Sequence, residues 1–439
     1  MNDTIAAIAT PLAQGAISII KVSGEDAIYY VNKIFDRDLT QFDRNTINYG
    51  NIIHNNEIID EVMVSIFKGP HSFTREDVVE INTHGGVLVT QTVLTLLLAQ
   101  GVRMANPGEF TQRGYLNGRL DLTQAEAIHD LIEANNNQGL KLAVSSLKGS
   151  VKRLLDPLIE DVLDTIAVIE VNIDYPEYDD VEILSSEIVK PRLDKWLIEL
   201  QAIIDRAERT KEIKDGVKTV IIGEPNVGKS SIFNALIEQD KAIVTNIAGT
   251  TRDLVEDKIR LENVTLALVD TAGLRDTEDV IEQIGIEKTR AALAEADFVI
   301  MVLDASRDMN AAEVELQTLI QDKKHLIVHN KSDLNAEGLI QVSALNNDVS
   351  QLEEAINKLF SDNVIDVKVE TLNNERQIGL ALKALNHFND ALNSIALGME
   401  LELVAIDLGE GYMAMKEILG EVSRDDLLDT LFSKFCLGK

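Results

Sequence analysis

Residues 223–230 read Gly-Glu-Pro-Asn-Val-Gly-Lys-Ser and match the pattern G-x-x-x-x-G-K-[ST]. They follow the apolar run KTVII and precede SSIFNALIE, so the pattern predicts a strand, a phosphate-binding loop and a helix. The glycines let backbone N–H groups turn toward phosphates, and the helix N-terminus adds positive potential. We expect Lys229 to neutralise the β- and γ-phosphates and Ser230 to ligate Mg²⁺. The stretch therefore predicts a nucleoside triphosphate site.

Two segments further along the chain indicate which nucleotide base is bound. Asn330-Lys331-Ser-Asp333 follows the apolar run HLIVH. The carboxylate of Asp333 can accept hydrogen bonds from guanine N1–H and the 2-amino group, which adenine cannot supply. Ser343-Ala344-Leu345 then offers a backbone contact to the guanine oxygen. The expected nucleotide is GTP.

Two more segments belong to a GTPase. Asp270-Thr-Ala-Gly273 ends the run VTLALVD, which predicts Asp270 near the Mg²⁺ and the Gly273 amide near the γ-phosphate. Residues 245–253 (TNIAGTTRD) read as the first switch, in which one of two paired threonines completes the Mg²⁺ shell. Leu274 stands where Ras-like enzymes have the glutamine that positions water, so another group must do that work. The expected GTP contacts are Asn226, Val227, Gly228, Lys229, Ser230, Ser231, Thr245, Asn246, Ile247, Ala248, Gly249, Thr250, Thr251, Asp270, Thr271, Ala272, Gly273, Asn330, Lys331, Asp333, Ser343, Ala344 and Leu345.

The flanking sequence differs in character from this centre. Short β-branched runs such as AISIIKVSG and EDVVEINTHGG predict a β-rich N-terminal part, residues 1–117. Helical periodicity occupies residues 118–212, where we expect Pro157 and an acidic loop at 175–180 to interrupt it, and returns over 370–439. Between them, in residues 216–362, apolar strands alternate with helices, as in a doubly wound, mostly parallel sheet. The order predicts a multidomain α/β protein in which a GTPase is inserted into one helical domain.

Composition narrows the function classes. A net charge of −32 opposes non-specific coating of nucleic acid. Lys141, Lys148, Lys152 and Arg153 form one candidate basic patch, for which a solvated helix face is the alternative reading. No apolar run approaches the roughly 20 residues that span a bilayer, and the N-terminus lacks the basic region of a signal peptide. The single cysteine, Cys436, fits a reducing compartment, so we expect the cytosol.

Six motifs spread over the whole chain carry a resemblance. They are SFTREDVVEINTHGG, PGEFTQRGYLNGRLDLTQAEAI, GEPNVGKSS, IAGTTRD, DTAGLR and the terminal FCLGK. Together they resemble the MnmE (TrmE) family of tRNA modification GTPases, of the TrmE-Era-EngA-like class. Leu437 is a conservative departure from the isoleucine usual there. The resemblance implies a tetrahydrofolate-binding, dimerising N-terminal domain, a discontinuous helical domain and an inserted Ras-like G domain.

The resemblance also implies how hydrolysis is assisted. In that family K⁺ takes the place of an arginine finger, and Asn226 and Thr245 match its ligands, with the backbone around Ile247 and Thr250. Ser230 and Thr251 match the Mg²⁺ ligands. A monovalent cation against the phosphates would offset developing charge much as an arginine does. Glu282 matches the carboxylate that orients the attacking water; from the sequence alone it reads as an exposed glutamate.

Folate and partners follow from the same resemblance. Lys21, Glu80, Arg119 and Lys439 match the folate positions, although each taken singly reads as surface charge. Cys436 is either a free thiol beside the folate pocket or a small buried hydrophobe. The implied reaction adds an aminomethyl or carboxymethylaminomethyl group to the wobble uridine of certain tRNAs. It would use a 5-formyl or 5,10-methylene tetrahydrofolate, in a homodimer joined by the flavoprotein MnmG (GidA), which would bring FAD and NADH.

An alternative function is an Era-like regulatory GTPase in ribosome assembly. Such proteins carry an RNA-binding module, often with a GxxG loop in basic surroundings. After residue 370 this chain has no GxxG and has an acidic segment, LGEGYMAMKEILGEVSRDDLLD. The sequence therefore favours the tRNA-modifying enzyme.

Overall fold

The structure is a computed structural model that describes most of the chain. The residues it leaves undescribed are 1–2, 42–44, 135–136, 175–185, 244–257, 262–263, 269–292, 335–337, 361–369, 423–427, 429–430, 434, 436–437 and 439. None of the helices in the described part of the chain has the length and apolar character needed to cross a bilayer.

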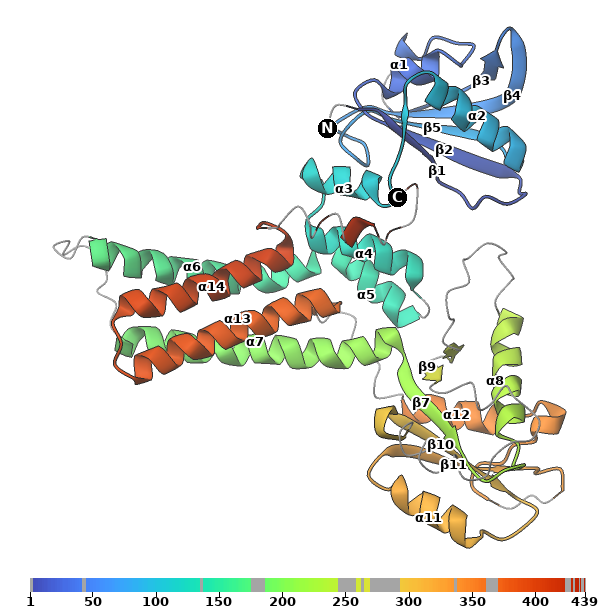
Figure 1. The fold of residues 1–439 in the computed structure, drawn as a ribbon, viewed down its shortest axis with the longest axis vertical. Helices are drawn as coiled ribbons and strands as arrows, with labels where there is room; N and C mark the ends of the chain where they lie inside the picture. Colours follow the sequence, from blue (N-terminus) through green and yellow to red (C-terminus); the bar gives the residue numbers. More distant parts are fainter. Residues whose placement is uncertain are drawn as a thin grey trace.

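The N-terminal part folds into a six-stranded sheet in the order β3-β4-β5-β2-β1-β6 (Figure 1). Residues alternate across its faces: Ile20, Val22 and Ile81 pack with the helices α1 and α2, whereas Lys21 and Glu80 belong to the opposite face. Neighbouring strands are antiparallel except β1 and β6. The elements are β1 Ile5–Ile8, β2 Ile17–Ser23, α1 Ala27–Asn32, the 3₁₀ turn η1 Leu39–Gln41, β3 Thr46–His54, β4 Glu57–Phe67, β5 Val78–His84, α2 Val87–Ala99 and β6 Arg103–Met104.

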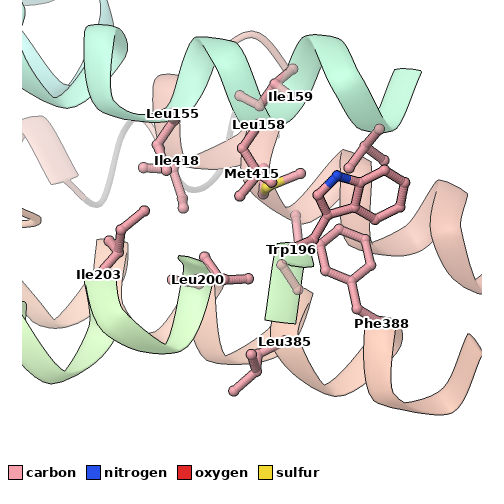
Figure 2. Close-up of a cluster of buried hydrophobic side chains, with 14 of the residues drawn as sticks. Leu155, Leu158, Ile159, Trp196, Leu200, Ile203, Leu385, Phe388, Met415 and Ile418 are labelled. Carbon is pink, nitrogen blue, oxygen red and sulfur yellow. The ribbon is translucent and has the colours of Figure 1, made fainter. Parts of the chain in front are cut away.

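Helices from two distant parts of the chain share one apolar core (Figure 2). The rings of Trp196 on α7 and Phe388 on α13 lie 5.9 Å apart at their centroids, and the indole N–H donates to Asp161 over 2.8 Å. The helical segments before and after the central sheet are therefore one packed unit, as the sequence predicted. The helices are α3 Glu109–Leu116, α4 Leu122–Glu133, α5 Asn137–Leu147, α6 Ser150–Asp174, α7 Ser186–Asp215, α13 Glu375–Ala396 and α14 Leu401–Leu419.

Pro157 does not interrupt the helix that contains it, so that expectation was wrong. Helix α6 runs without a break from Ser150 to Asp174. Proline costs a helix interior one backbone hydrogen bond and a steric clash with the preceding turn. Here Leu155, Leu158 and Ile159 surround the proline in sequence and are all buried in the shared core. Tertiary burial on both sides of the proline offsets its local cost.

The centre of the chain folds into a five-stranded sheet in the order β11-β10-β7-β9-β8. Strands β7, β9, β10 and β11 are parallel, as the alternating pattern predicted, and the short edge strand β8, which the sequence did not reveal, is antiparallel. The elements are β7 Val217–Ile222, α8 Lys229–Ile243, β8 Lys258–Arg260, β9 Thr265–Leu268, β10 Phe298–Asp304, α11 Ala311–Leu319, β11 Lys324–Asn330, the 3₁₀ turn η2 Ala344–Asn346 and α12 Ser350–Leu359.

A single residue joins the long helix α7 to the sheet: Gly216 lies between Asp215 and Val217. Its φ of +95° favours glycine, and an added Cβ would lie 3.0 Å from the carbonyl oxygen of Thr265. Where the chain returns to the helices, Glu370 accepts from Arg153 through its carboxylate (2.9 Å) and from Arg206 through its carbonyl oxygen (3.1 Å). The chain is therefore constrained at both connections between the helices and the central sheet, at Gly216 and at Glu370.

Two of the four residues of the candidate basic patch, Lys152 and Arg153, are paired with carboxylates. Lys152 bridges Asp156 at 3.2 Å and Glu421 at 3.1 Å, and Arg153 pairs with Glu370. These partners come from three separate segments of the chain. Lys152 and Arg153 therefore form ion pairs within the protein, which weakens the interpretation of this patch as a nucleic-acid surface.

Candidate functional site

The phosphate-binding loop has the predicted local structure. Strand β7 leads into residues 223–228, and α8 begins at Lys229 with the Ile232 N–H donating to the Gly228 carbonyl over 3.0 Å. Gly228 has a φ of +95°, and a Cβ there would lie 2.1 Å from Nδ2 of Asn330. Asn226 is also left-handed, at φ +64°, and is exposed. Only a glycine at 228 lets the loop pass this close to Asn330.

Lys229 lies across the loop that precedes it. Its ammonium donates to the carbonyl oxygens of Gly223 at 2.9 Å and Glu224 at 2.8 Å. Burial lowers the pKa of Lys229, and the nearby Glu224 carboxylate only partly opposes this shift. A desolvated ammonium held by two neutral carbonyls gains when an anion approaches it. The group is therefore suited to phosphate.

Asn330 joins the phosphate loop to the predicted base-reading loop. Its amide donates to the Val227 carbonyl over 2.8 Å, and its oxygen accepts from the Ala344 N–H at 3.2 Å. The residue is buried, so both bonds form away from water. One side chain thus fixes the spacing between two loops more than 100 residues apart in the chain.

Asp333 is held by Ser343, which belongs to the segment expected to contact the guanine oxygen through its backbone. The hydroxyl of Ser343 donates to Oδ1 of Asp333 over 2.8 Å, and Ser343 is buried. Asp333 itself is exposed. A carboxylate oriented in this way presents a fixed acceptor face to two donors on a base. Leu345, two residues after Ser343, is 85% exposed.

Several expected residues lie outside the described part of the chain. They are Thr245, Asn246, Ile247, Ala248, Gly249, Thr250, Thr251, Asp270, Thr271, Ala272, Gly273, Glu282, Cys436 and Lys439. Of the expected Mg²⁺ and K⁺ ligands, Ser230 and Asn226 are therefore the described ones, both in the phosphate loop.

A second cluster forms on the N-terminal sheet, around Phe73. The Lys21 ammonium lies 4.3 Å from the centre of this ring, and the Arg119 guanidinium carbon lies 4.7 Å from it. Arg119 also donates to the Phe73 carbonyl over 3.1 Å. Burial, with a smaller contribution from Arg75, lowers the pKa of Arg119. Two cations on one aromatic ring form a positive site with an apolar wall.

Strand register adds Glu80 to this cluster. Lys21 on β2 and Glu80 on β5 are directly opposed in the antiparallel ladder, so their side chains share a face. The structure therefore brings together three of the four predicted folate positions, which are distant in sequence. The Phe73 ring, which Lys21 and Arg119 both contact, lies within the quoted motif SFTREDVVEINTHGG but was not predicted as a site residue, because the sequence does not show which cations the ring meets.

The C-terminal tail approaches the same sheet within one chain. A Cβ on Gly438 would lie 2.8 Å from the Ile8 carbonyl, at the end of β1, where Ala7 is paired with Lys21. Earlier in the tail, the Phe435 ring stacks on His129 of α4 with centroids 4.9 Å apart. The last described residue of the tail thus lies near the strand that carries Lys21.

Comparisons with known proteins agree over the whole length. The family model for the GTP-binding protein TrmE N-terminus matches residues 4–119, and that for the MnmE helical domain matches residues 122–436. A tRNA modification GTPase MnmE of Streptococcus thermophilus (strain CNRZ 1066) is 47% identical over 449 residues, covering 100% of this chain and 98% of the relative. Its namesake in Lactococcus lactis subsp. cremoris (strain SK11) is 45% identical over 448 residues, with the same coverage.

Proposed function

This chain belongs to the MnmE family of tRNA modification GTPases, and from that premise we propose that it hydrolyses GTP while modifying carbon 5 of the wobble uridine of certain tRNAs. The main support for GTP binding is the pair of hydrogen bonds made by the Asn330 side chain. They connect the phosphate loop to Ala344, which lies next to the Ser343 that orients Asp333. The tRNA part rests on family membership. We assign residues 1–117, 118–212, 216–362 and 370–439 to the N-terminal domain, the first helical part, the G domain and the second helical part.

Hydrolysis is proposed to depend on two cations. Ser230 and Thr251 would hold Mg²⁺, and Asn226, Thr245 and the backbone of Ile247 and Thr250 would hold K⁺. Support comes from Leu274, which cannot position water, and from the left-handed Asn226 in the phosphate loop. We expect GTP turnover to be fast in K⁺ and slow in Na⁺. Equal rates in the two salts at matched ionic strength would remove K⁺ from the proposal.

The cluster around Phe73 is proposed to bind a tetrahydrofolate. The residues fit: Glu80 can accept from the pterin's paired donors, and the cations Lys21 and Arg119 suit an anionic glutamate tail. When bound, the folate supplies a one-carbon unit. Lys439 and the Cys436 thiol would join the pocket, an expectation supported by the approach of Gly438 to Ile8.

The protein is further proposed to act in the cytosol as a homodimer with the flavoprotein MnmG (GidA). FAD and NADH would belong to that partner.

Mass analysis of tRNA nucleosides from a deletion strain tests the whole assignment. The wobble modification should be lost, restored by the intact gene and not restored by Lys229→Ala or by a chain that ends at Phe435. The truncated protein should hydrolyse GTP at the wild-type rate and bind formyl-tetrahydrofolate more weakly. A deletion strain with unchanged nucleosides would contradict the proposed function, whereas an active truncated chain would contradict only the role of the tail.

A further inference from the structure

Asp304 lies at the base-reading edge of the central sheet, although no motif marks it. It is the last residue of β10 and is directly opposed to Asn330, the last residue of β11. Because the two strands are parallel, their carboxyl ends open on the same edge, where ligands of such sheets bind. The carboxylate of Asp304 accepts a hydrogen bond from the ammonium of Lys331 over 2.6 Å.

This carboxylate is itself fixed. Its Oδ1 accepts from the backbone N–H of Ser306 at 2.9 Å and from the hydroxyl of the same residue at 2.6 Å, while Oδ2 faces Lys331. The side chain is only 11% exposed. Burial acts to raise the pKa of Asp304, but the hydrogen bonds from Lys331 and Ser306 outweigh it and lower the pKa to about 2. The group is therefore an anion throughout the physiological range.

Lys331 has an unusual backbone for a residue with a side chain. Its φ is +68°, in the left-handed region, and its carbonyl accepts from Leu334 over 2.9 Å to close the turn that carries Asp333. A non-glycine residue persists in this conformation only where its surroundings hold it. The ion pair with Asp304 is one such restraint. It neutralises the ammonium, and the Lys331 side chain keeps 34% of its surface exposed.

We propose that Asp304 is a positioning residue for the guanine base: it holds the ammonium of Lys331 so that the lysine stem forms an apolar wall beside the carboxylate of Asp333. The inference rests on the proposed assignment of residues 330–333 as the base-reading loop. Asp304 does not touch the base in this scheme; it acts through Lys331.

The same loop offers a matched control. Arg307 makes two hydrogen bonds to Glu313, at 2.8 and 2.9 Å, and Glu313 also accepts from the N–H of Asn310 at the start of α11. Glu313 is buried, and these bonds hold the loop onto α11. Glu313→Gln therefore loosens the loop after β10 without removing the partner of Lys331.

Titration of the full-length protein with fluorescent GDP and IDP analogues tests the inference. Asp304→Asn should weaken the binding of both by about tenfold, near the lower end of what a hydrogen bond to a charged group contributes. The affinities for GDP and IDP should fall by the same factor, because the aliphatic stem of Lys331 makes no contact that depends on the 2-amino group of the base. KM for GTP should rise by a similar factor with kcat unchanged, and Glu313→Gln should stay within twofold of wild type.

A double-mutant cycle with Lys331→Met separates positioning from a general structural loss. In the Lys331→Met background, Asp304→Asn should change affinity by less than about twofold. The same loss in both backgrounds, or an unweakened Asp304→Asn single variant, would overturn the inference. If Lys331→Met and Asp333→Asn also leave affinity unchanged, then the base-reading loop itself is misassigned. A loss in those two variants alone would contradict only the role of Asp304.

Discussion

The two candidate sites are assembled in different ways from two sheets. In the central sheet, parallel strands deliver contiguous motifs to one edge, so residues 223–230 and 330–333 carry their chemistry in a short run. In the N-terminal sheet, antiparallel register places Lys21 against Glu80, and loops add Phe73 and Arg119. A site of the first kind is visible in sequence. A site of the second kind exists only once the sheet has formed.

The largest expected effect concerns hydrolysis. Glu282→Ala should lower kcat for GTP by roughly 10²–10⁴-fold, because a group that orients water contributes mainly in the transition state. GDP affinity should change little, which stopped-flow binding can check. Glu295→Ala, at an exposed glutamate just before β10, is the matched control and should be neutral. A kcat within about fivefold of wild type would make Glu282 a bystander.

The next effect concerns how the N-terminal sheet is held. Arg113 is buried and pairs with Asp3 at 2.8 Å and with Glu76 and Glu109 at 3.1 Å each. Arg113→Met leaves a buried carboxylate, Glu109, without one of its cations, and should cost about 3–5 kcal/mol of stability. Urea unfolding of the full chain should show a transition at a lower urea concentration in the variant than in the wild type. GTP turnover below that transition should be unaffected, and a loss of GTP turnover would show that the two sheets are coupled.

Base choice provides a smaller effect. Asp333→Asn should weaken GTP binding by about 1–3 kcal/mol and favour xanthosine nucleotides, because the amide inverts one hydrogen bond. Ser343→Ala, which removes the hydroxyl that orients the carboxylate, should lose less and keep guanine preference. Competition binding measures both. Undiminished preference for GTP in Asp333→Asn would remove this carboxylate from base reading.

The smallest effect concerns Phe73. Phe73→Leu keeps an apolar side chain but removes the ring shared by Lys21 and Arg119, so it should cost about 0.5–2 kcal/mol of formyl-tetrahydrofolate affinity. Calorimetry measures this loss, and GTP turnover serves as the internal control. Unchanged folate affinity would place the ligand away from this ring.

The sequence predicted the parts of the fold and site that depend on short-range pattern. The strands β7, β9, β10 and β11, the phosphate loop and the shared helical core all follow from periodicity and spacing. The continuity of α6 through Pro157 was mispredicted, because burial of the neighbouring leucines decides it.

The roles of Phe73 and Asp304 escaped sequence reasoning for a related reason. Each depends on a partner brought near by tertiary structure: Phe73 on two cations from separate segments, and Asp304 on the register between β10 and β11. The run FVIMVLD next to HLIVHN contains a signal for Asp304, since a polar residue at the end of a buried parallel strand faces the ligand edge.

Gly216 gives the molecule a mechanical property. Helix α7 has 30 residues and is therefore about 45 Å long, and one residue separates it from the strand that ends at the phosphate loop (Figure 1). Because α7 is packed into the shared helical core, the whole bundle would move with it, as a lever arm attached at Gly216. Each degree of rotation at Gly216 would move the far end of α7 by roughly 0.8 Å. A small angular change at Gly216, beside the phosphate loop, would therefore be magnified at the opposite end of the helical bundle.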